Sequence, residues 1–492
     1  MTLIELGRPV ASPPRLATLP VAIIGAGPVG LAAAAHLVQR GIDFELFESG
    51  ETAASSLTSW GHIRLFSPWR FLIDPAARIL LEADAWVFPP DDALPLAAEL
   101  VERYLAPLAA LDSIASRTHL GTSVTTVTRE GMDRTRTAGR ADAPFVLRLR
   151  SADGEEHEVL ARAVIDASGT YLSANPLGSG GVDPLGASAV SDLVLPALPD
   201  VLGADRARFS GRHTVVVGAG HSAANTLLNL AELARQEPGT SVSWLIRNRG
   251  AVRVSDSADD VLAARAALGA GVGKLVKSGA VDVIDRFEIA RLSRIARGDG
   301  DAAVAPRVVS DAGRGVGVGV GAGAGAGVSA GRGAGVGRGA GVDSDARAGV
   351  RITGRRGDDP AATVDADLIV NATGFRPDLS MLGEMRLDLD PVVQAPTRLA
   401  PLIDPNDHSC GTVEPHGYAQ LAHPEPGFFI AGMKSYGRAP TFLLATGYEQ
   451  VRSIVAWLDG DMRAATSVEL VLPATGVCSS GEGADATASS CC

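Results

Sequence analysis

The chain contains little cysteine. Its four residues among 492 are Cys410, Cys478, Cys491 and Cys492. None forms a Cys-x-x-Cys or Cys-x-x-x-x-Cys pair, the spacings at which a protein disulfide exchanges electrons through thiolate attack. The sequence therefore excludes an enzyme that carries its own dithiol at such a spacing. So few cysteines in a long chain are typical of a reducing compartment, and we expect a cytoplasmic protein.

Long hydrophobic runs and net positive charge are also missing. No stretch of eighteen apolar residues occurs, so we expect no transmembrane helix. Residues 1–19 lack the basic start and continuous apolar core of a signal peptide, and we interpret them as a short disordered lead. The formal net charge of −12 argues against nucleic acid or an anionic membrane as the main partner. We expect a small-molecule substrate, and association into a homo-oligomer stays open.

Two glycine-rich fingerprints are present, in Val21–Gly30 and Thr214–Ala223. Each follows a β-branched run and precedes a helical stretch rich in alanine and leucine, which is the context of a dinucleotide-binding turn. In such turns the phosphates lie on the N–H groups at the start of the helix. The key positions are Gly25, Gly27, Pro28 and Gly30 in the first fingerprint and Gly218, Gly220 and Ala223 in the second. We predict an α/β fold with two Rossmann-like domains and two dinucleotide cofactors.

The first fingerprint is predicted to bind FAD. A helix over Leu31–Arg40 is followed by Gly41 and by a strand over Phe44–Glu48. Glu48 stands 18 positions after Gly30, near the spacing of the acid that binds a ribose diol. A carboxylate there suits FAD or NAD and repels a 2′-phosphate. The alternative is a solvated charge at the end of a strand.

The second fingerprint is predicted to bind NADPH. Its next strand, Ser241–Ile246, is followed by Arg247 and Arg249 rather than by an acid, and guanidinium groups bind phosphates well. His221 and Ser222 begin the helix, where the Ser222 hydroxyl can reach the pyrophosphate. The alternative is a pair of ordinary surface arginines, because the chain has only three lysines and arginine is its default cation.

Further segments resemble the flavoproteins with two dinucleotide-binding domains, a superfamily that includes flavin-containing monooxygenases, N-hydroxylating monooxygenases and thioredoxin reductases. Ala163–Tyr171 resembles the turn at which the chain leaves the flavin domain, and Asp367–Asp378 resembles the turn at which it returns. Gly427–Gly432 resembles the last flavin strand, and a helix is expected over about 441–458. The resemblance implies cofactor contacts at Val124, Ser168, Gly169, Thr373, Gly374, Gly432, Met433 and Thr441.

The order of these segments predicts an NADPH domain inserted into a discontinuous FAD domain. The FAD domain is expected over 18–170 and 366–460, and the NAD(P)H domain over 171–365. Strands over Ser123–Thr128 and Phe145–Arg150 resemble the small sheet in which the Val124 backbone lies near adenine. Residues 313–342 are almost entirely Gly, Ala, Val and Arg and are expected to be a disordered surface insert. The tail 464–492 is expected to be flexible.

The missing dithiol favours a monooxygenase, because reduced FAD can then pass oxygen to a small nucleophilic substrate without a redox cysteine. The linker motif Phe-x-Gly-x-x-x-His of the flavin-containing and Baeyer–Villiger monooxygenases is absent between Gly169 and Gly218, so this assignment is partly analogy. Two alternatives stay open. One is a reductase or oxidase acting on a thiol or on an arsenic or mercury compound, with Cys410 or the tail pair Cys491–Cys492 helping. The other is a flavin-binding redox sensor.

Three segments carry the remaining candidate residues. Ser59–Arg70 contains Trp60 and Arg64, which are candidates to line the flavin, and His62, a candidate proton donor. Asp407–His416 contains Cys410, an activated thiolate or a buried structural cysteine. Gly432–Pro440 contains Lys434, a candidate to stabilise negative charge on reduced flavin. The histidines of the second segment do not have zinc-site spacing, so no metal is expected.

Overall fold

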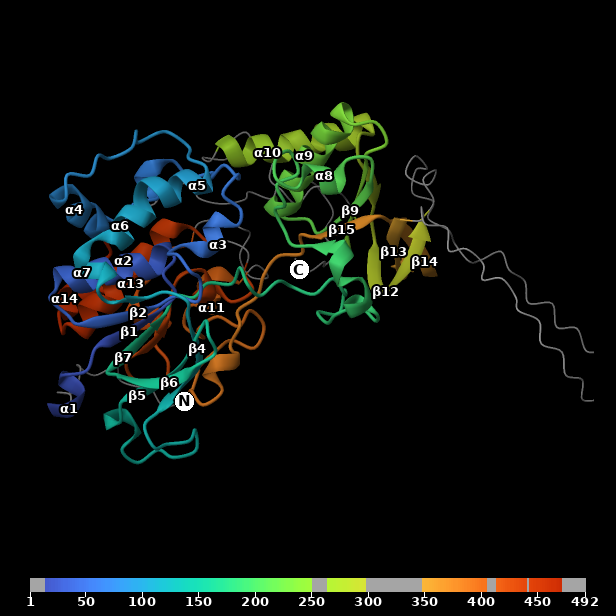
Figure 1. Ribbon diagram of the computed structural model, residues 1–492. Helices are drawn as coiled ribbons and strands as arrows, with labels where there is room; N and C mark the ends of the chain where they lie inside the picture. The colour runs from blue at the N-terminus through green and yellow to red at the C-terminus, as the bar shows by residue number, and fades with distance from the viewer. Residues whose placement is uncertain (1–13, 250–262, 298–346, 405–412, 440–441, 471–492) are drawn as a thin grey trace, which may run out of the picture. The chain divides into compact units, whose positions relative to one another are not determined.

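The computed structural model describes residues 14–249, 263–297, 347–404, 413–439 and 442–470 (Figure 1). The chain divides into two compact units, and the second, residues 176–252 and 272–373, is inserted into the first. The first combines residues 1–175, 253–271 and 374–492. The glycine-rich segment 313–342 lies outside the described residues, as do Cys410, Thr441 and the tail from residue 471.

A five-stranded parallel sheet forms the centre of the first unit, in the order β16-β7-β1-β2-β3. β1 is central because its four residues are apolar and buried, as a strand covered on both faces requires. The register pairs Ile24 at the end of β1 with Phe47 on one side and Asp166 on the other. The strands are β1 (Val21–Ile24), β2 (Phe44–Phe47), β3 (Thr118–His119), β7 (Ala163–Asp166) and β16 (Phe428–Ile430).

Helices cover one face of this sheet, and a second sheet covers the other (Figure 1). The first glycine turn leads into α2 (Pro28–Gln39), which is buried from Pro28 to Leu37 and packs against α13 (Leu444–Leu458). α2 ends before Gly41, whose φ of +64° is the left-handed conformation that glycine favours. The opposite face packs on the antiparallel strands β4 (Thr122–Arg129), β5 (Phe145–Ser151) and β6 (Glu156–Ala161).

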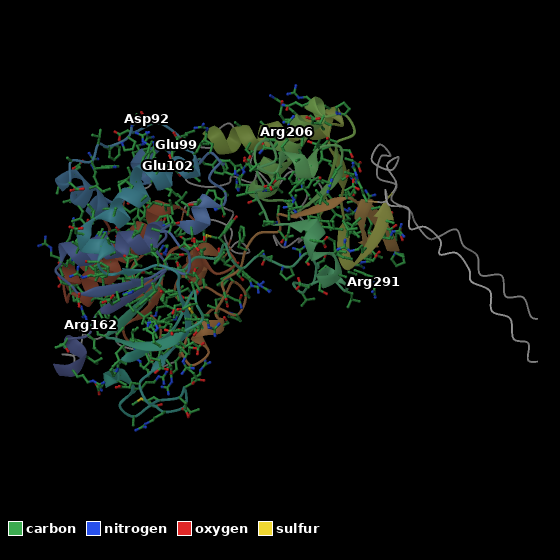
Figure 2. All side chains as sticks on the ribbon, in the orientation of Figure 1. Asp92, Glu99, Glu102, Arg162, Arg206 and Arg291 are labelled. Atoms are coloured by element: carbon green, nitrogen blue, oxygen red, sulfur yellow. The ribbon has the colours of Figure 1, made fainter. Side chains whose placement is uncertain are left out.

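Shorter helices complete the first unit. Around α5 (Ala97–Leu100), Asp92 and Glu102 are exposed, and Glu99 caps the helix by accepting a hydrogen bond from Leu96 N at 2.7 Å (Figure 2). These elements are α1 (Pro14–Ala17), α3 (Ser55–Thr58), η1 (Trp69–Phe71), α4 (Pro75–Ala83), α5 (Ala97–Leu100), η2 (Val101–Leu105), α6 (Ala106–Ala110), α7 (Asp112–Ala115), η3 (Arg140–Asp142), η6 (Ser380–Leu382), α11 (Ala400–Ile403), α12 (Tyr418–Leu421), η7 (Gly432–Tyr436) and α14 (Met462–Thr466).

The second unit repeats the same plan. Its five-stranded parallel sheet has the order β11-β10-β9-β15-β8, with β9 at its centre as β1 is at the centre of the first sheet. A three-stranded antiparallel sheet accompanies it. The parallel strands are β8 (Val194–Leu195), β9 (His213–Val217), β10 (Ser241–Leu245), β11 (Asp282–Ile284) and β15 (Leu368–Asn371). The remaining elements of this unit are β12 (Phe287–Arg297), β13 (Arg347–Arg356), β14 (Asp359–Ala366), η4 (Ala187–Leu193), α8 (Arg206–Phe209) and α9 (His221–Gln236). α10 (Ala263–Ser278) begins in residues assigned to the first unit and ends in residues assigned to the second.

The structure confirms the predicted α/β class and the principal strands, and it corrects some details. The segment between Gly169 and Gly218, for which the sequence predicts no element before the second fingerprint, contains η4 and β8. α14 extends to Thr466, so the start of the predicted flexible tail belongs to a folded element. Arg452 in α13 holds α14 in place by donating a hydrogen bond from Nη1 to Ala464 O at 2.9 Å. Within the described residues, no helix has the length and apolar character needed to cross a membrane.

A buried polar cluster ties the antiparallel sheet of the first unit to the segment before β16. Glu425 is 1% exposed and forms ion pairs with Arg129 at 3.3 Å and Arg140 at 2.6 Å. His423, shortly before Glu425 in the sequence, is also buried, and its Nδ1 accepts a hydrogen bond from Asp388 N at 3.2 Å. Burial lowers the pKa of His423 to about 4, because the charged imidazolium loses its hydration there.

This shift predicts loss of stability in acid. The folded protein keeps His423 neutral down to a pH of about 4, whereas the unfolded chain takes up a proton near pH 6.5. The free energy of unfolding should therefore fall by about 3 kcal/mol from His423 alone as the pH decreases from 6.5 to 4. His423→Asn keeps an acceptor for Asp388 N and should flatten this decline in urea titrations at pH 7 and pH 5. Equal pH dependence in both proteins would contradict the assignment.

Candidate functional site

The first glycine turn leaves an open cradle at the start of α2. Gly25 has a φ of +95°, and a Cβ there would lie 2.8 Å from Ser168 Cα, so packing and conformation both require glycine. A Cβ on Gly30 would lie 1.9 Å from Gly25 O. A Cβ on Gly27 would meet nothing within 4 Å. The space before Gly27 and the uncapped start of α2 fit a pyrophosphate.

Glu48 lies directly after β2 and closes this cradle. Its side chain is buried, with Oε2 accepting a hydrogen bond from Ala26 N at 2.8 Å and Oε1 accepting one from Gly50 N at 2.8 Å. The carboxylate is therefore fixed beside the glycine turn and is not a solvated charge. Binding of a ribose diol by Glu48 stays a prediction. Val124, expected near adenine, is half-buried in β4.

The second glycine turn has the same geometry. Gly218 has a φ of +127°, and a Cβ there would lie 2.1 Å from Ala372 O. A Cβ on Gly220 would meet nothing within 4 Å, which leaves a second open cradle at the uncapped start of α9. Ala223, in place of the third glycine, is fully buried, so its methyl group is accommodated. These residues fit a second dinucleotide, with His221 and Ser222 in the first turn of α9.

Arg247 and Arg249 follow β10, as the sequence predicts, and both side chains are exposed. Arg247 Nη1 donates a hydrogen bond to Ser179 O at 3.2 Å. The pair is thus placed at the carboxyl end of the strand next to the second glycine turn, and its binding to a 2′-phosphate stays a prediction.

The two turns at which the chain crosses between the units share one hydrogen-bond pattern. In the first, Ser168 N and Ser168 Oγ donate to Asp166 Oδ1 at 3.1 and 2.7 Å. In the second, Thr373 N and Thr373 Oγ1 donate to Asn371 Oδ1 at 3.2 and 2.7 Å. Sequence reasoning did not single out Asp166 and Asn371. The repeated pattern (Asp/Asn)-Ala-(Ser/Thr)-Gly would have identified them.

Lys434 pairs with the Asp166 carboxylate, the charged group that the first turn has where the second has Asn371. Its Nζ lies 2.7 Å from Asp166 Oδ2 and donates a hydrogen bond to Ser168 Oγ at 3.0 Å, with both ionic side chains almost completely buried. Asn371, in the corresponding position of the second turn, is neutral. The positive charge of Lys434 is therefore paired with a protein carboxylate, which gives it a structural role at the carboxyl edge of the sheet.

A buried hydrogen-bond network holds the loop that contains Lys434. Gly432 N donates to Gln450 Oε1 at 2.8 Å, and Gln450 Nε2 contacts Ser435 Oγ at 3.0 Å and His416 Nε2 at 2.8 Å. Burial lowers the pKa of His416, so the ring stays neutral in this network. A Cβ on Gly432 would lie 3.2 Å from the Val29 side chain, which places the loop against the start of α2. Met433, predicted at the flavin, is half-buried in the same loop.

The three candidates in Ser59–Arg70 have different environments. Arg64 is exposed, and its Nη1 donates a hydrogen bond to Leu94 O at 2.5 Å. Trp60 Nε1 and His62 Nε2 are buried and have no hydrogen-bond partner within the part of the chain that the structure describes. Buried polar groups normally have partners, so these two nitrogens indicate a group that the protein does not itself supply. No group of three or more His, Cys, Asp or Glu side chains placed to bind a metal occurs among the described residues.

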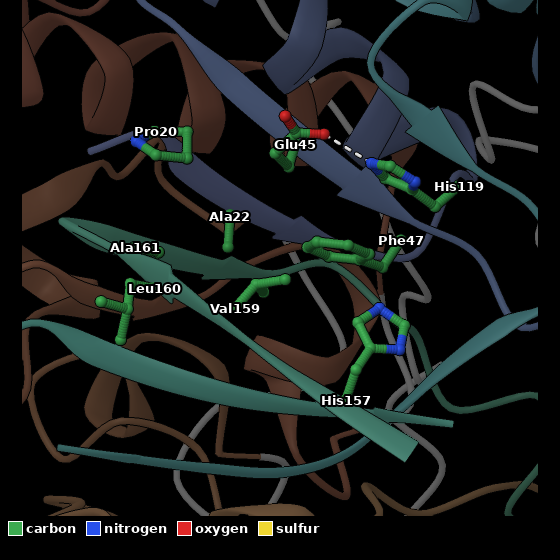
Figure 3. Close-up of a pocket in the computed structure, with 9 residues that line it drawn as sticks. All are labelled: Pro20, Ala22, Glu45, Phe47, His119, His157, Val159, Leu160 and Ala161. Atoms are coloured by element: carbon green, nitrogen blue, oxygen red, sulfur yellow. Dashed lines mark hydrogen bonds and ion pairs between the residues drawn. The ribbon is translucent and has the colours of Figure 1, made fainter. Parts of the chain in front are cut away.

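A pocket of about 260 Å³ lies between the parallel sheet of the first unit and the edge strand β6 (Figure 3). Its lining is mostly apolar, and at one side of it Glu45 Oε2 lies 2.5 Å from His119 Nε2. Its lining residues are Pro20, Ala22, Glu45, Phe47, His119, His157, Val159, Leu160 and Ala161. None of these is a predicted cofactor ligand, so no predicted cofactor contact lies in this crevice between the two sheets.

Comparison with known proteins agrees with this geometry. Residues 20–217 match the model of a family described as FAD dependent oxidoreductase. This part of the chain, which contains the first glycine turn, is therefore similar to an FAD-dependent oxidoreductase domain. This match confirms FAD as a cofactor, and its placement at the first glycine turn stays a prediction. A search of the curated proteins found no match.

Solved structures share the fold over most of the chain. A bacillithiol disulfide reductase from Bacillus cereus is 17% identical, with a TM-score of 0.57 over 90% of this chain and 99% of its own. A cadaverine monooxygenase from Erwinia amylovora is 12% identical, with a TM-score of 0.55 over 94% and 99%. An ornithine N-hydroxylase from Kutzneria is 15% identical, with a TM-score of 0.53 over 92% and 100%. The predicted fold, an α/β architecture with two Rossmann-like domains, is thereby confirmed.

The two open cradles predict that the same change, Gly to Val, abolishes FAD binding in the first cradle and not in the second. Gly27→Val should leave the fold intact, because a side chain there meets no protein atom, but it should abolish FAD binding by blocking the pyrophosphate. Gly220→Val is the matched control and should retain FAD. Circular dichroism and the flavin absorbance per protein measure both effects. A full complement of flavin in Gly27→Val would contradict the placement of the cofactor.

The buried pair Lys434–Asp166 predicts rescue by a second substitution. Lys434→Met alone leaves a buried carboxylate unpaired and should reduce the free energy of unfolding by about 3–5 kcal/mol. Adding Asp166→Asn reproduces the neutral turn of Asn371 and Thr373 and should restore most of this loss. Urea denaturation of the single and double variants measures the coupling. Additive losses would show that the two charges do not act as a pair.

Proposed function

We propose that the protein is an FAD- and NADPH-dependent monooxygenase that oxygenates a small nucleophilic molecule in the cytoplasm. The observation that carries the proposal is the combination of two open dinucleotide cradles with the absence of a Cys-x-x-Cys or Cys-x-x-x-x-Cys pair from the sequence. When bound, FAD and NADPH would supply the hydride transfer and the reaction with oxygen, and the residues of the two cradles would hold them. The balanced reaction consumes NADPH, a proton, oxygen and substrate, and yields NADP⁺, water and the oxygenated substrate.

The residues of the chain have defined tasks in this proposal. The turn with Gly27 and the start of α2 bind the flavin pyrophosphate, and Glu48 binds the ribose. The turn with Gly220 and the start of α9 bind the second dinucleotide. Lys434 holds the loop after β16 through Asp166. Trp60 and His62 provide buried nitrogens that have no partner among the residues that the structure describes. The fold shared with the cadaverine and ornithine enzymes is consistent with this function.

Arg247 and Arg249 are proposed to select NADPH. Removing both side chains (Arg247→Ala with Arg249→Ala) should raise the KM for NADPH far more than that for NADH, since one charge-assisted phosphate contact contributes about 1.5–3 kcal/mol. Arg291→Ala removes another exposed arginine from the same unit and serves as the control (Figure 2). Steady-state NADPH and NADH oxidation provide the measurement. Equal effects on both coenzymes would reject a role in phosphate recognition.

Oxygen consumption tests the reaction itself. With NADPH and methyl phenyl sulfide as a nucleophilic probe, a monooxygenase should consume one oxygen for each NADPH and form the sulfoxide, with little hydrogen peroxide. The alternative reductase, for which the fold shared with the bacillithiol disulfide reductase is the relevant observation, should instead oxidise NADPH without oxygen when given a low-molecular-weight disulfide. A flavin-binding sensor would show no sustained NADPH oxidation under either condition.

A further inference from the structure

Three aromatic rings from separate segments of the first unit lie in contact. Trp60, just after α3, lies 6.4 Å from Tyr171 between ring centroids, and Tyr171 lies 5.3 Å from Phe375. All three side chains are half-buried, so each retains accessible surface. Aromatic residues form only 4% of the chain, and this contact joins three of them from segments far apart in sequence. We call Trp60, Tyr171 and Phe375 the aromatic wall.

The aromatic wall lies at the carboxyl edge of the parallel sheet. Tyr171 follows Ser168, whose Cα is the atom that a Cβ on Gly25 would meet at 2.8 Å. Phe375 follows Gly374, and the segments of Tyr171 and Phe375 are joined by the hydrogen bonds Asn175 N to Gly374 O and Arg376 N to Ser173 O, both 2.9 Å. Ligands of open α/β sheets bind beyond this edge. The wall is therefore placed beside the cradle predicted to hold the flavin.

A buried polar atom of the aromatic wall, the Trp60 indole nitrogen, has no partner in the part of the chain that the structure describes. Trp60 Nε1 is buried and finds no acceptor among the described residues. An indole N–H can only donate, so a hydrogen-bond acceptor on a bound molecule is the group that satisfies it. An ammonium group has no acceptor to offer. The nitrogen thus favours a molecule with an acceptor oxygen over a cationic amine.

We propose that the aromatic wall binds the substrate, and that the substrate is a small, uncharged aromatic compound with an acceptor oxygen that receives the Trp60 N–H. The half-buried rings provide flat apolar surface for an aromatic ring, and the indole N–H fixes its orientation. This inference rests on the proposed monooxygenase function. It assigns a substrate chemistry different from the amines named for the cadaverine and ornithine enzymes.

Two probes that differ by one acceptor test the inference. 4-(Methylthio)acetophenone carries an aromatic ring, a nucleophilic sulfur and a carbonyl oxygen, whereas methyl phenyl sulfide lacks the carbonyl. Calorimetric titration of the FAD-loaded protein, without NADPH, should show about fivefold tighter binding of the acetophenone, as expected for one neutral hydrogen bond. Trp60→Phe should bind both probes equally. Tyr171→Leu should weaken both by several fold.

Trp86→Phe is the matched control, because Trp86 is also half-buried but its Nε1 already donates to Arg103 O at 2.7 Å. This variant should keep the preference for the acetophenone. The inference is overturned if Trp60→Phe keeps that preference, if cadaverine binds more tightly than either probe, or if Trp60→Phe loses FAD, which would identify the flavin as the acceptor. If Trp60→Phe does not fold, undiminished binding of both probes to Tyr171→Leu overturns it.

Probe binding and oxygen consumption separate this inference from the function on which it rests. Binding is measured without NADPH, so it does not depend on turnover. Preferential binding of the acetophenone without coupled oxygen consumption would support the aromatic wall and reject the monooxygenase. Coupled oxygenation with no contribution from Trp60 or Tyr171 would support the monooxygenase and reject the wall.

Discussion

The close approach of a glycine turn to a crossing turn is the constraint on which both halves of this protein depend. Gly25 lies against the backbone of Ala167 and Ser168, and Gly218 lies against that of Ala372. At each place there is no room for a side chain, so the first strand, the helix after it and the crossing strand are fixed together. The same contact leaves the next glycine open toward the start of the helix. One packing requirement thus both builds the sheet edge and forms the cradle.

The two halves differ in the polar side chain that closes the crossing turn, which is Asp166 in the first and Asn371 in the second. Asn371 completes its turn as a neutral amide, while Asp166 makes the same turn with a charge and depends on Lys434 to balance it. A buried charge without a partner is costly, so Asp166 ties β7 to the loop after β16. That loop is in turn held by Gln450 and His416. Buried polar contacts between distant segments therefore hold the carboxyl edge of this sheet, and the glycine-rich sequence motif alone does not indicate them.

The groups beside this rigid edge define what the proposed reaction would act on. Arg64 donates to a backbone carbonyl and Lys434 pairs with a carboxylate, so both cations are occupied by the protein itself. Trp60 Nε1, by contrast, has no acceptor among the described residues and lies in the aromatic wall. In the proposed function this leaves ring stacking and one donated hydrogen bond as the means of recognition. Such a surface is suited to an uncharged ring, whatever atom of it reacts.

The sequence by itself determined the two glycine turns, the strands around them and the nested order of the crossing segments, because backbone conformation and strand burial are local properties of a few residues. Glu48 also followed from spacing alone. Tertiary structure decided the partners of Lys434, His416 and Trp60, since these depend on side chains that meet from distant segments. Lys434 finds Asp166 across 268 positions, and no local pattern encodes that contact. The sequence therefore specified the glycine turns and the strands around them, and tertiary packing specified which polar groups remain available to a ligand.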